Sequence, residues 1–178
     1  MNTSRVYGQS VDLDENEIAR FWKTRTECQN RLRAIMLGDD YPISLIEKRN
    51  QAECEILCSF LTFSKPFSIL DIGCGTARWA DNFKDKYSFY TGIDLTEDFI
   101  LQNKARYKDD NQCRFYKMSA CALEPIITDN KYDLIIVSAV MMYINDDSLN
   151  NLFRNISEMI QKMAWYIFRN RLVRWIPD

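Results

Sequence analysis

The chain has 178 residues, of which 47% are hydrophobic and 27% are charged, and its formal net charge is -2. These values fit one globular domain with a sizeable core, and a chain without a long basic run lacks the charge pattern of a nucleic-acid binder. The sequence has no histidine, which excludes a histidine general base, a Ser-His-Asp triad and a histidine zinc site.

Targeting and redox signals are weak. No apolar stretch reaches the length of a membrane span, and the N-terminus is too polar for a signal peptide. We therefore expect a cytoplasmic protein without a membrane span. The six cysteines form no Cys-x-x-Cys pair, so they are expected to be reduced thiols and not metal ligands.

Two helices are predicted before the first strand. Apolar side chains keep roughly helical spacing over residues 15–37, and Gly38 is placed to end that helix. A turn around Pro42 can start a second helix, which we expect to run to about residue 63. The sequence thus predicts an N-terminal helical extension, or lid, over residues 1–66.

After Pro66 the chain alternates strands and helices. The predicted strands cover residues 67–72, 87–94, 114–118 and 132–138, and the predicted helices lie near 77–85, 97–107 and 148–162. This alternation indicates a parallel sheet with right-handed crossovers. We therefore predict an α/β fold, with a Rossmann-like, mostly parallel sheet in a cofactor-binding domain over residues 67–178.

The most informative motif lies between the first strand and the next helix. Asp71-x-Gly73-x-Gly75 places an acid and two glycines where the chain must turn sharply, and bare glycine backbone lets a ligand come close. The N-terminal amides of the next helix face the same crevice. Asp94 ends the second strand, about twenty residues later, where an acid can accept two ribose hydroxyls. The motif predicts a nucleotide-like cofactor.

Two classes of cofactor fit an acid after the second strand. A dinucleotide fold wants a third glycine where this chain has Arg78, and Asp71 would repel a pyrophosphate at short range. A cationic sulfonium group would instead be attracted by Asp71. A nicotinamide oxidoreductase therefore ranks behind an S-adenosylmethionine enzyme. The simplest alternative is a tight turn flanked by ordinary turn acids.

Asp71-x-Gly73-x-Gly75, followed by Gly92-Ile93-Asp94, resembles the class I S-adenosylmethionine-dependent methyltransferases. The resemblance covers residues 67 to about 160. It implies that Gly73 and Gly75 contact the methionine end of S-adenosyl-L-methionine, that Asp71 orients this end, and that Asp94 holds the ribose.

The resemblance implies further cofactor-binding residues, which are Cys74, Leu95, Ser119, Ala120 and Ser138. The backbone around Ser119 and Ala120 would meet the adenine. Ser119 stands where many relatives carry an acid that binds the adenine amino group, so that contact is not expected here.

An N-terminal segment, Phe21-Trp22-Lys23-Thr24-Arg25, resembles a segment with which many methyltransferases close over the cofactor. The resemblance implies that Arg25 meets the carboxylate of the cofactor. An exposed arginine on an amphipathic helix is the alternative.

The loop after the fourth strand, residues 139–147, is the predicted acceptor loop because ligands bind past the carboxyl ends of parallel strands. Methyl transfer needs alignment and, for a hydroxyl acceptor, removal of a proton. Tyr143, Asp146 and Asp147 are the candidate catalytic groups. The alternatives are that the two acids cap the next helix and that Tyr143 packs in the core.

The acceptor itself is suggested only by resemblance. The Arg49-Asn50-x-x-Glu53 region and the loop Met-Met-Tyr-Ile-Asn-Asp look like bacterial methyltransferases of surface-polysaccharide clusters. These act on a sugar hydroxyl of lipopolysaccharide O-antigen, for example on terminal perosamine. A small-molecule or glycan acceptor is thus expected, and a non-catalytic cofactor-binding or partner-pairing module is the alternative. The oligomeric state stays open.

The C-terminal part looks incomplete against the resemblance. The sheet of the family has seven strands, whereas four strands are predicted here and residues 164–168 are a candidate fifth. No residues are left for the remaining hairpin, which forms the antiparallel edge of the sheet. Read in a shifted frame, the codons after Lys162 resemble the family's entry into its fifth strand. We therefore expect a frameshift truncation near Lys162 that reduces or abolishes activity. The alternative is a genuine short methyltransferase whose tail is a fifth strand and a basic C-terminus.

Overall fold

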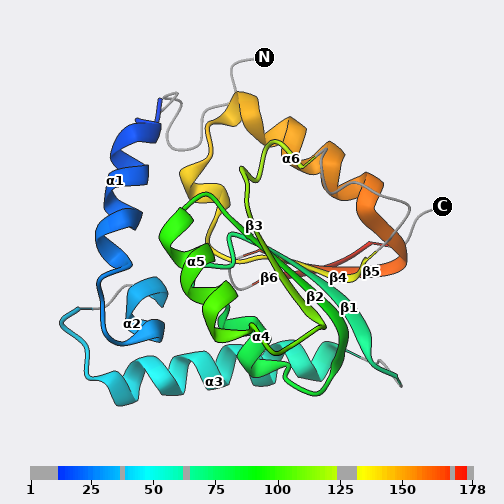
Figure 1. The fold of residues 1–178 in the computed structure, drawn as a ribbon. Helices are drawn as coiled ribbons and strands as arrows, with labels where there is room; N and C mark the ends of the chain where they lie inside the picture. Colours follow the sequence, from blue (N-terminus) through cyan, green and yellow to red (C-terminus); the bar gives the residue numbers. More distant parts are fainter. Residues whose placement is uncertain (1–11, 37–38, 62–64, 124–131, 169–170, 176–178) are drawn as a thin grey trace.

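A computed structural model describes residues 12–36, 39–61, 65–123, 132–168 and 171–175, with residues 160–168 and 171–175 described by their backbone alone. In these ranges the strands form one sheet of order β3-β2-β1-β4-β5-β6, with helices packed around it (Figure 1). The strands are β1 (Phe67–Ile72), β2 (Tyr87–Asp94), β3 (Cys113–Lys117), β4 (Tyr132–Val137), β5 (Ile160–Phe168) and β6 (Arg171–Trp175). Strands β1 to β5 are parallel, and β6 is antiparallel to β5.

The predicted Rossmann-like fold is confirmed, and the first four strands lie within one residue of their predicted bounds. Successive side chains of a strand point to opposite faces of the sheet. In β1, Ile69 packs in a core with Leu57 and Phe83, whereas Leu70 packs in a second core with Ile156. Burial on both faces explains why β1 and β4 are almost continuously apolar.

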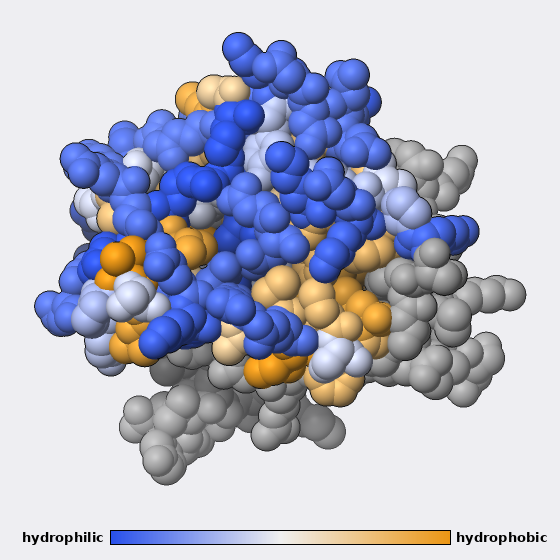
Figure 2. All heavy atoms as spheres, turned by 90° about the horizontal axis from the view of Figure 1, so that it is seen from below, coloured by the Kyte–Doolittle hydropathy of each residue, from blue (hydrophilic) through white to orange (hydrophobic). Residues whose placement is uncertain are grey.

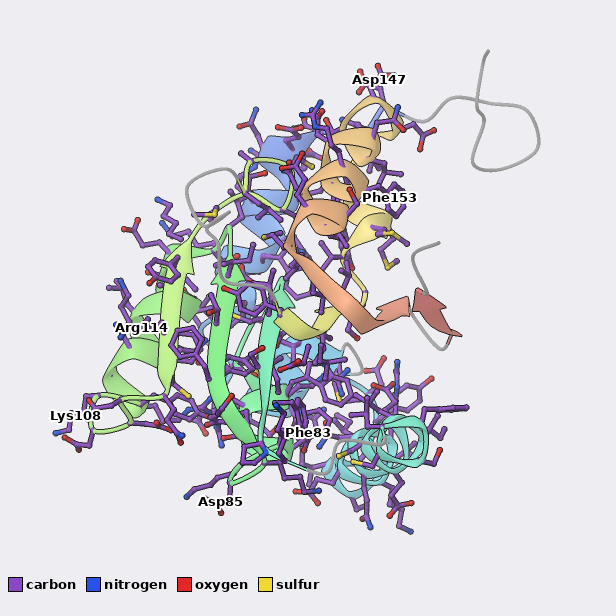
Figure 3. The ribbon with its side chains drawn as sticks, turned by 90° about the vertical axis from the view of Figure 1, so that its right-hand side faces the viewer. Phe83, Asp85, Lys108, Arg114, Asp147 and Phe153 are labelled. Carbon is purple, nitrogen blue, oxygen red and sulfur yellow. The ribbon has the colours of Figure 1, made fainter. Side chains whose placement is uncertain are left out.

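The helices cover these two faces. Helices α3 (Ile43–Phe60), α4 (Arg78–Asn82) and α5 (Glu97–Arg106) supply side chains to the first core, and α6 (Asp146–Met159) supplies side chains to the second. Figure 3 shows Phe83 at the end of the sheet opposite to Asp147.

The single helix predicted over residues 15–37 is wrong, because the structure has two helices there. Helix α1 (Glu15–Arg25) begins at Asp14, whose side chain accepts the amides of Asn16 and Glu17, and α2 (Arg31–Met36) follows after a break. At the break the Thr26 hydroxyl donates to a backbone carbonyl and Asn30 accepts a backbone amide of α2. Such side chains compete with helical hydrogen bonds, which apolar spacing alone does not reveal. The predicted helix end at Gly38 lies outside the described residues, whereas α3 ends at Phe60, before the expected end near residue 63.

The C-terminal elements also differ from the prediction. Helix α6 begins at Asp146, two residues earlier than expected, and β5 covers the candidate strand at 164–168 from Ile160 onward. The expectation that no residues remain for an antiparallel edge strand is corrected by β6, whose Arg171 lies opposite Phe168. Phe168 and Arg171 are close in the sequence, and the sequence analysis did not weigh an antiparallel pair at so short a separation.

No helix in the described part of the chain is long and apolar enough to cross a membrane.

The face that contains α3 is largely hydrophilic, with hydrophobic residues gathered between the hydrophilic ones (Figure 2). Leu45, Ile56 and Phe60 of α3 are among the exposed large hydrophobic side chains.

Candidate functional site

A cavity of about 1260 Å³ lies at the carboxyl ends of β1 to β4. Its floor is built from the turns that follow these strands, and its walls come from α1, α2 and α3. Because β2 and β4 lie on opposite sides of β1, the strand order reverses at this point. This is the position where open α/β sheets bind their ligands. The volume of the cavity exceeds the usual range for a small-molecule site, about 300 to 1,000 Å³.

The glycine turn after β1 is hydrogen-bonded to the end of β2. The amides of Gly73 and Cys74 both donate to the Ile93 carbonyl, over 2.8 and 2.9 Å. Gly73 has φ +73° and Gly75 has φ +49°, a backbone region that L side chains adopt at a cost. Glycine is therefore required by the backbone here, in addition to any approach of a ligand.

Helix α2 covers the glycine turn, a contact that the sequence did not suggest. A β-carbon added at Gly75 would lie 2.6 Å from Cγ2 of Ile35, and the Thr76 hydroxyl donates to the Arg31 carbonyl over 3.1 Å. The N-terminal helices thus contact the cofactor-binding motif directly. Ile35 belongs to the apolar residues with helical spacing over 15–37, but that spacing does not indicate which segment it contacts.

Asp94 organises the turn through its carboxylate. Oδ2 accepts the Gly75 amide and Oδ1 accepts the Thr96 amide, both over 2.8 Å. Burial raises the pKa of Asp94, against the lowering effect of these hydrogen bonds. Hydrogen bonds from the Thr96 side chain and the Leu95 backbone also reach Asp94, and Asp94 lines the cavity.

Asp71 is almost fully buried beneath the same turn. The Tyr90 hydroxyl donates to its Oδ2 over 2.6 Å. Burial raises the pKa of Asp71 to about 7, while the Tyr90 hydrogen bond and the charge of Arg78 lower it and the charge of Asp94 raises it. Asp71 also lines the cavity, so its ionised form can act on a charged ligand bound there.

This raised pKa predicts a specific dependence of stability on pH. The ordinary pKa of an aspartate is 3.8, so between about pH 4 and pH 7 the folded chain holds a proton on Asp71 that the unfolded chain has released. The stabilisation is complete below about pH 4 and is lost as the pH rises through about 7. We expect Asp71→Asn to flatten this part of the curve, by up to about 1.4 kcal/mol per pH unit.

Urea unfolding of the original chain and of Asp71→Asn between pH 4 and 8 measures this difference. Asp109→Asn, at an exposed position, is the matched control and should keep the original slope. Equal slopes for Asp71→Asn and the original chain would contradict the assignment of this proton to Asp71.

The predicted cofactor-binding residues converge, with one exception. The cavity is lined by Asp71, Gly73, Cys74, Gly75, Asp94, Leu95, Ser119, Ala120 and Ser138. Ser119 accepts the Cys121 amide over 3.2 Å, which shapes the loop after β3. Ser138 accepts a hydrogen bond from Arg78 over 3.1 Å.

Arg25 is the exception, since it is not among the residues that line the cavity. Its guanidinium donates to the carbonyls of Ala34 and Arg33 and forms an ion pair with Asp39. These contacts tie the end of α1 to α2. In this structure Arg25 therefore connects two helices of the extension.

Only one of the three candidate catalytic residues lines the cavity. Tyr143 lines the cavity in the short 3₁₀ helix η2 (Met141–Tyr143), whereas Asp146 and Asp147 do not. Both acids lie in the first turn of α6, where the helix dipole favours negative charge. In Figure 3, Asp147 lies at the end of α6 and points away from the sheet.

The acceptor loop is hydrogen-bonded to the residue that precedes the N-cap of α1. Asn145 accepts the Leu13 amide over 2.8 Å and donates to the Leu13 carbonyl over 3.3 Å. The rings of Trp22 and Tyr143 meet edge to face, with centroids 5.4 Å apart. Helix α1 and the loop after β4 thus close one side of the cavity together.

Known proteins share this architecture. A family model described as a methyltransferase domain matches residues 69–163. Phosphoethanolamine N-methyltransferase 1 of Zea mays is 23% identical over 158 residues, which are 89% of this chain and 30% of that protein. The chain therefore spans less than a third of the length of this curated relative.

Solved structures with a similar fold include phosphoethanolamine N-methyltransferase 1 of Haemonchus contortus, with a TM-score of 0.71 and 17% identity, covering 86% of this chain and 31% of that one. N-methyltransferase NodS of Bradyrhizobium japonicum has a TM-score of 0.67 and 18% identity, covering 84% and 71%. Both structures are complexes with S-adenosylhomocysteine. A third, geranyl diphosphate C-methyltransferase of Streptomyces coelicolor, has a TM-score of 0.62 and 17% identity, covering 86% and 63%. At these identities the likeness shows the fold.

Proposed function

This chain belongs to the methyltransferase domain family, and we propose that it binds S-adenosyl-L-methionine in the cavity and transfers the methyl group to a small-molecule acceptor. The observation that carries the proposal is the buried Asp71 beside the glycine turn. A carboxylate there attracts a cationic sulfonium or ammonium group and repels a pyrophosphate. The position where a dinucleotide fold has its third glycine is filled by the buried Arg78.

The residues around the turn fit such a cofactor. We assign the ribose hydroxyls to Asp94, because this acid lies at the end of β2 and lines the cavity. The methionine end is assigned to Asp71 and to the backbone of Gly73 and Gly75, with Cys74 between them. The adenine is assigned to the loop at Ser119 and Ala120 and to the exposed Leu95, with Ser138 at the end of β4 completing the set. Residues 1–66 are proposed to act as the lid.

A methyl group on a sulfonium is already activated, so the main task of these residues is alignment. A hydroxyl acceptor must also lose a proton. Of the three candidates we assign this role first to Tyr143, because it lines the cavity. Asp146 and Asp147 remain candidates only if the loop before α6 moves.

The acceptor we propose is a hydroxyl of a sugar, of the kind found in lipopolysaccharide O-antigen, and the proposal includes a cytoplasmic location. Its support is the resemblance of the 49–53 region and of the acceptor loop. Similar proteins are named for phosphoethanolamine and geranyl diphosphate, which supports a small acceptor more broadly. A module that binds cofactor without turnover is the second candidate, and a frameshift near Lys162, testable by sequencing the gene, would favour it.

Calorimetry of the full chain with S-adenosylmethionine, S-adenosylhomocysteine and NAD tests the cofactor, and we expect binding of the first two only. Labelled methyl transfer to sugar nucleotides, O-antigen oligosaccharides and phosphoethanolamine then tests the acceptor. Uptake of NAD without S-adenosylmethionine would overturn the proposal. Cofactor binding without transfer to any of these acceptors would favour the non-catalytic module.

A further inference from the structure

One acid bridges two arginines on the α3 side of the cavity. Glu53 accepts a hydrogen bond from Nε of Arg49 at Oε1, over 3.0 Å, and one from Nη2 of Arg78 at Oε2, over 2.8 Å. All three residues line the cavity. We call Arg49, Glu53 and Arg78 the Glu53 cluster.

Arg78 is the fixed member of the Glu53 cluster. Its side chain is 8% exposed. It also donates to Asn50 over 3.0 Å and to Ser138 over 3.1 Å, and its guanidinium stacks on the Trp79 ring at 4.1 Å. These contacts compensate the loss of water around a buried cation and hold its charge at the end of β4, where the acceptor loop begins.

Arg49 is the member of the Glu53 cluster whose side chain is available to bind a ligand. Its side chain is 51% exposed, and within the described residues its Nε donates to Glu53 while the two terminal nitrogens donate to no protein group. A guanidinium presents a planar pair of donors that matches a carboxylate or phosphate. Arg49 can therefore bind an anion in the cavity without breaking its contact with Glu53.

The charges of the Glu53 cluster do not cancel, because two cations face one acid. The other side of the floor carries Asp71 and Asp94. The charge of Arg78 is close enough to Asp71 to lower the pKa of that carboxyl. The cavity thus has an anionic part at the glycine turn and a cationic part at α3, an arrangement that suits a ligand carrying both charges.

We propose that the Glu53 cluster binds one carboxylate or phosphate group of a small molecule held in the cavity. The anion can belong to the amino-acid part of the cofactor or to the acceptor. Arg25, the residue expected from sequence to meet the cofactor carboxylate, is engaged by Asp39 and by backbone carbonyls instead. The placement beside a cofactor rests on the proposed function, whereas the anion site itself does not.

The test compares the full chain with Arg49→Gln, and Lys48→Gln serves as the control. Lys48 is the neighbouring exposed cation of α3 and does not line the cavity. The first probe pair is S-adenosylhomocysteine and its analogue without the carboxylate, titrated by calorimetry. The second probe is inorganic phosphate, measured through its effect on the melting temperature with S-adenosylhomocysteine present. One lost charge-assisted hydrogen-bond pair corresponds to about a tenfold loss of affinity.

If the anion belongs to the cofactor, Arg49→Gln weakens S-adenosylhomocysteine about tenfold and leaves the analogue unchanged. If it belongs to the acceptor, S-adenosylhomocysteine is unaffected, and the stabilisation by phosphate is lost in Arg49→Gln but kept in Lys48→Gln. The proposal is overturned if neither probe responds to Arg49→Gln, or if S-adenosylhomocysteine and the analogue weaken equally. If S-adenosylhomocysteine fails to bind the original chain while phosphate still depends on Arg49, the proposed function fails and the anion site stands.

Discussion

Replacing Asp94 with alanine is expected to weaken the binding of S-adenosylhomocysteine by a hundredfold or more, about the effect of two hydrogen bonds to a charged group. The carboxylate accepts the amides of Gly75 and Thr96, so its loss releases the glycine turn. The proposed contacts with both ribose hydroxyls are lost with it. Calorimetry measures the change, and Asp109→Ala, which removes an exposed acid, should bind as the original chain does.

A comparison of ligands separates the ribose contacts from the turn. Adenosine and 2′,3′-dideoxyadenosine differ only in the two hydroxyls assigned to Asp94. We expect the original chain to prefer adenosine and Asp94→Ala to bind the two equally weakly. If the variant still discriminated between them, the ribose hydroxyls would have another partner.

Replacing Gly73 with alanine is expected to lower the free energy of unfolding by about 3 kcal/mol. A φ of +73° disfavours any residue with a β-carbon, by about 1 to 2 kcal/mol. The added carbon would also lie 2.2 Å from Cγ2 of Val140, and overpacking of this kind costs typically 1 to 3 kcal/mol. Urea unfolding of the two proteins measures the difference.

The double variant Gly73→Ala with Val140→Ala tests the contribution of overpacking against Val140 to the loss of stability. Shortening Val140 removes the close contact but leaves the backbone conformation strained, so we expect recovery of roughly half of the lost stability. Val140→Ala alone is the reference for the shortened side chain. A Gly73→Ala protein as stable as the original would show that the turn adopts another backbone conformation.

Local patterns predicted the half of the fold that carries the cofactor motif. The apolar runs that became β1, β2 and β4 are buried on both faces of the sheet, and such burial leaves a direct trace in the sequence. Gly73, Gly75 and Asp94 were identified because positive φ and strand-end acids restrict residue type at short range. The break between α1 and α2 was missed because it depends on hydrogen bonds made by the side chains of Thr26 and Asn30. The spacing of apolar residues does not depend on these polar side chains.

Contacts between distant segments required the coordinates. Arg78 was considered in the sequence only as a missing glycine, whereas the fold makes it the partner of Glu53 and Ser138, 25 and 60 residues away. Arg25 was placed near the cofactor by resemblance and Asp147 near the acceptor by its position in the loop after the fourth strand, but neither residue lines the cavity. Direction of a side chain depends on the rotation of its helix against the sheet, which a linear motif does not specify.

By itself the sequence determined the α/β alternation, the glycine turn and the acids at the ends of two strands, because each depends on conformational preferences within a few residues. Only the tertiary structure decided which charges share the cavity, since α3, the turn after β1 and the end of β4 are brought together by packing on the sheet. The pKa of Asp71 and the pairing of Arg49 with Arg78 through Glu53 follow from that packing. Electrostatic energy depends on distance and burial, and both are properties of the folded chain.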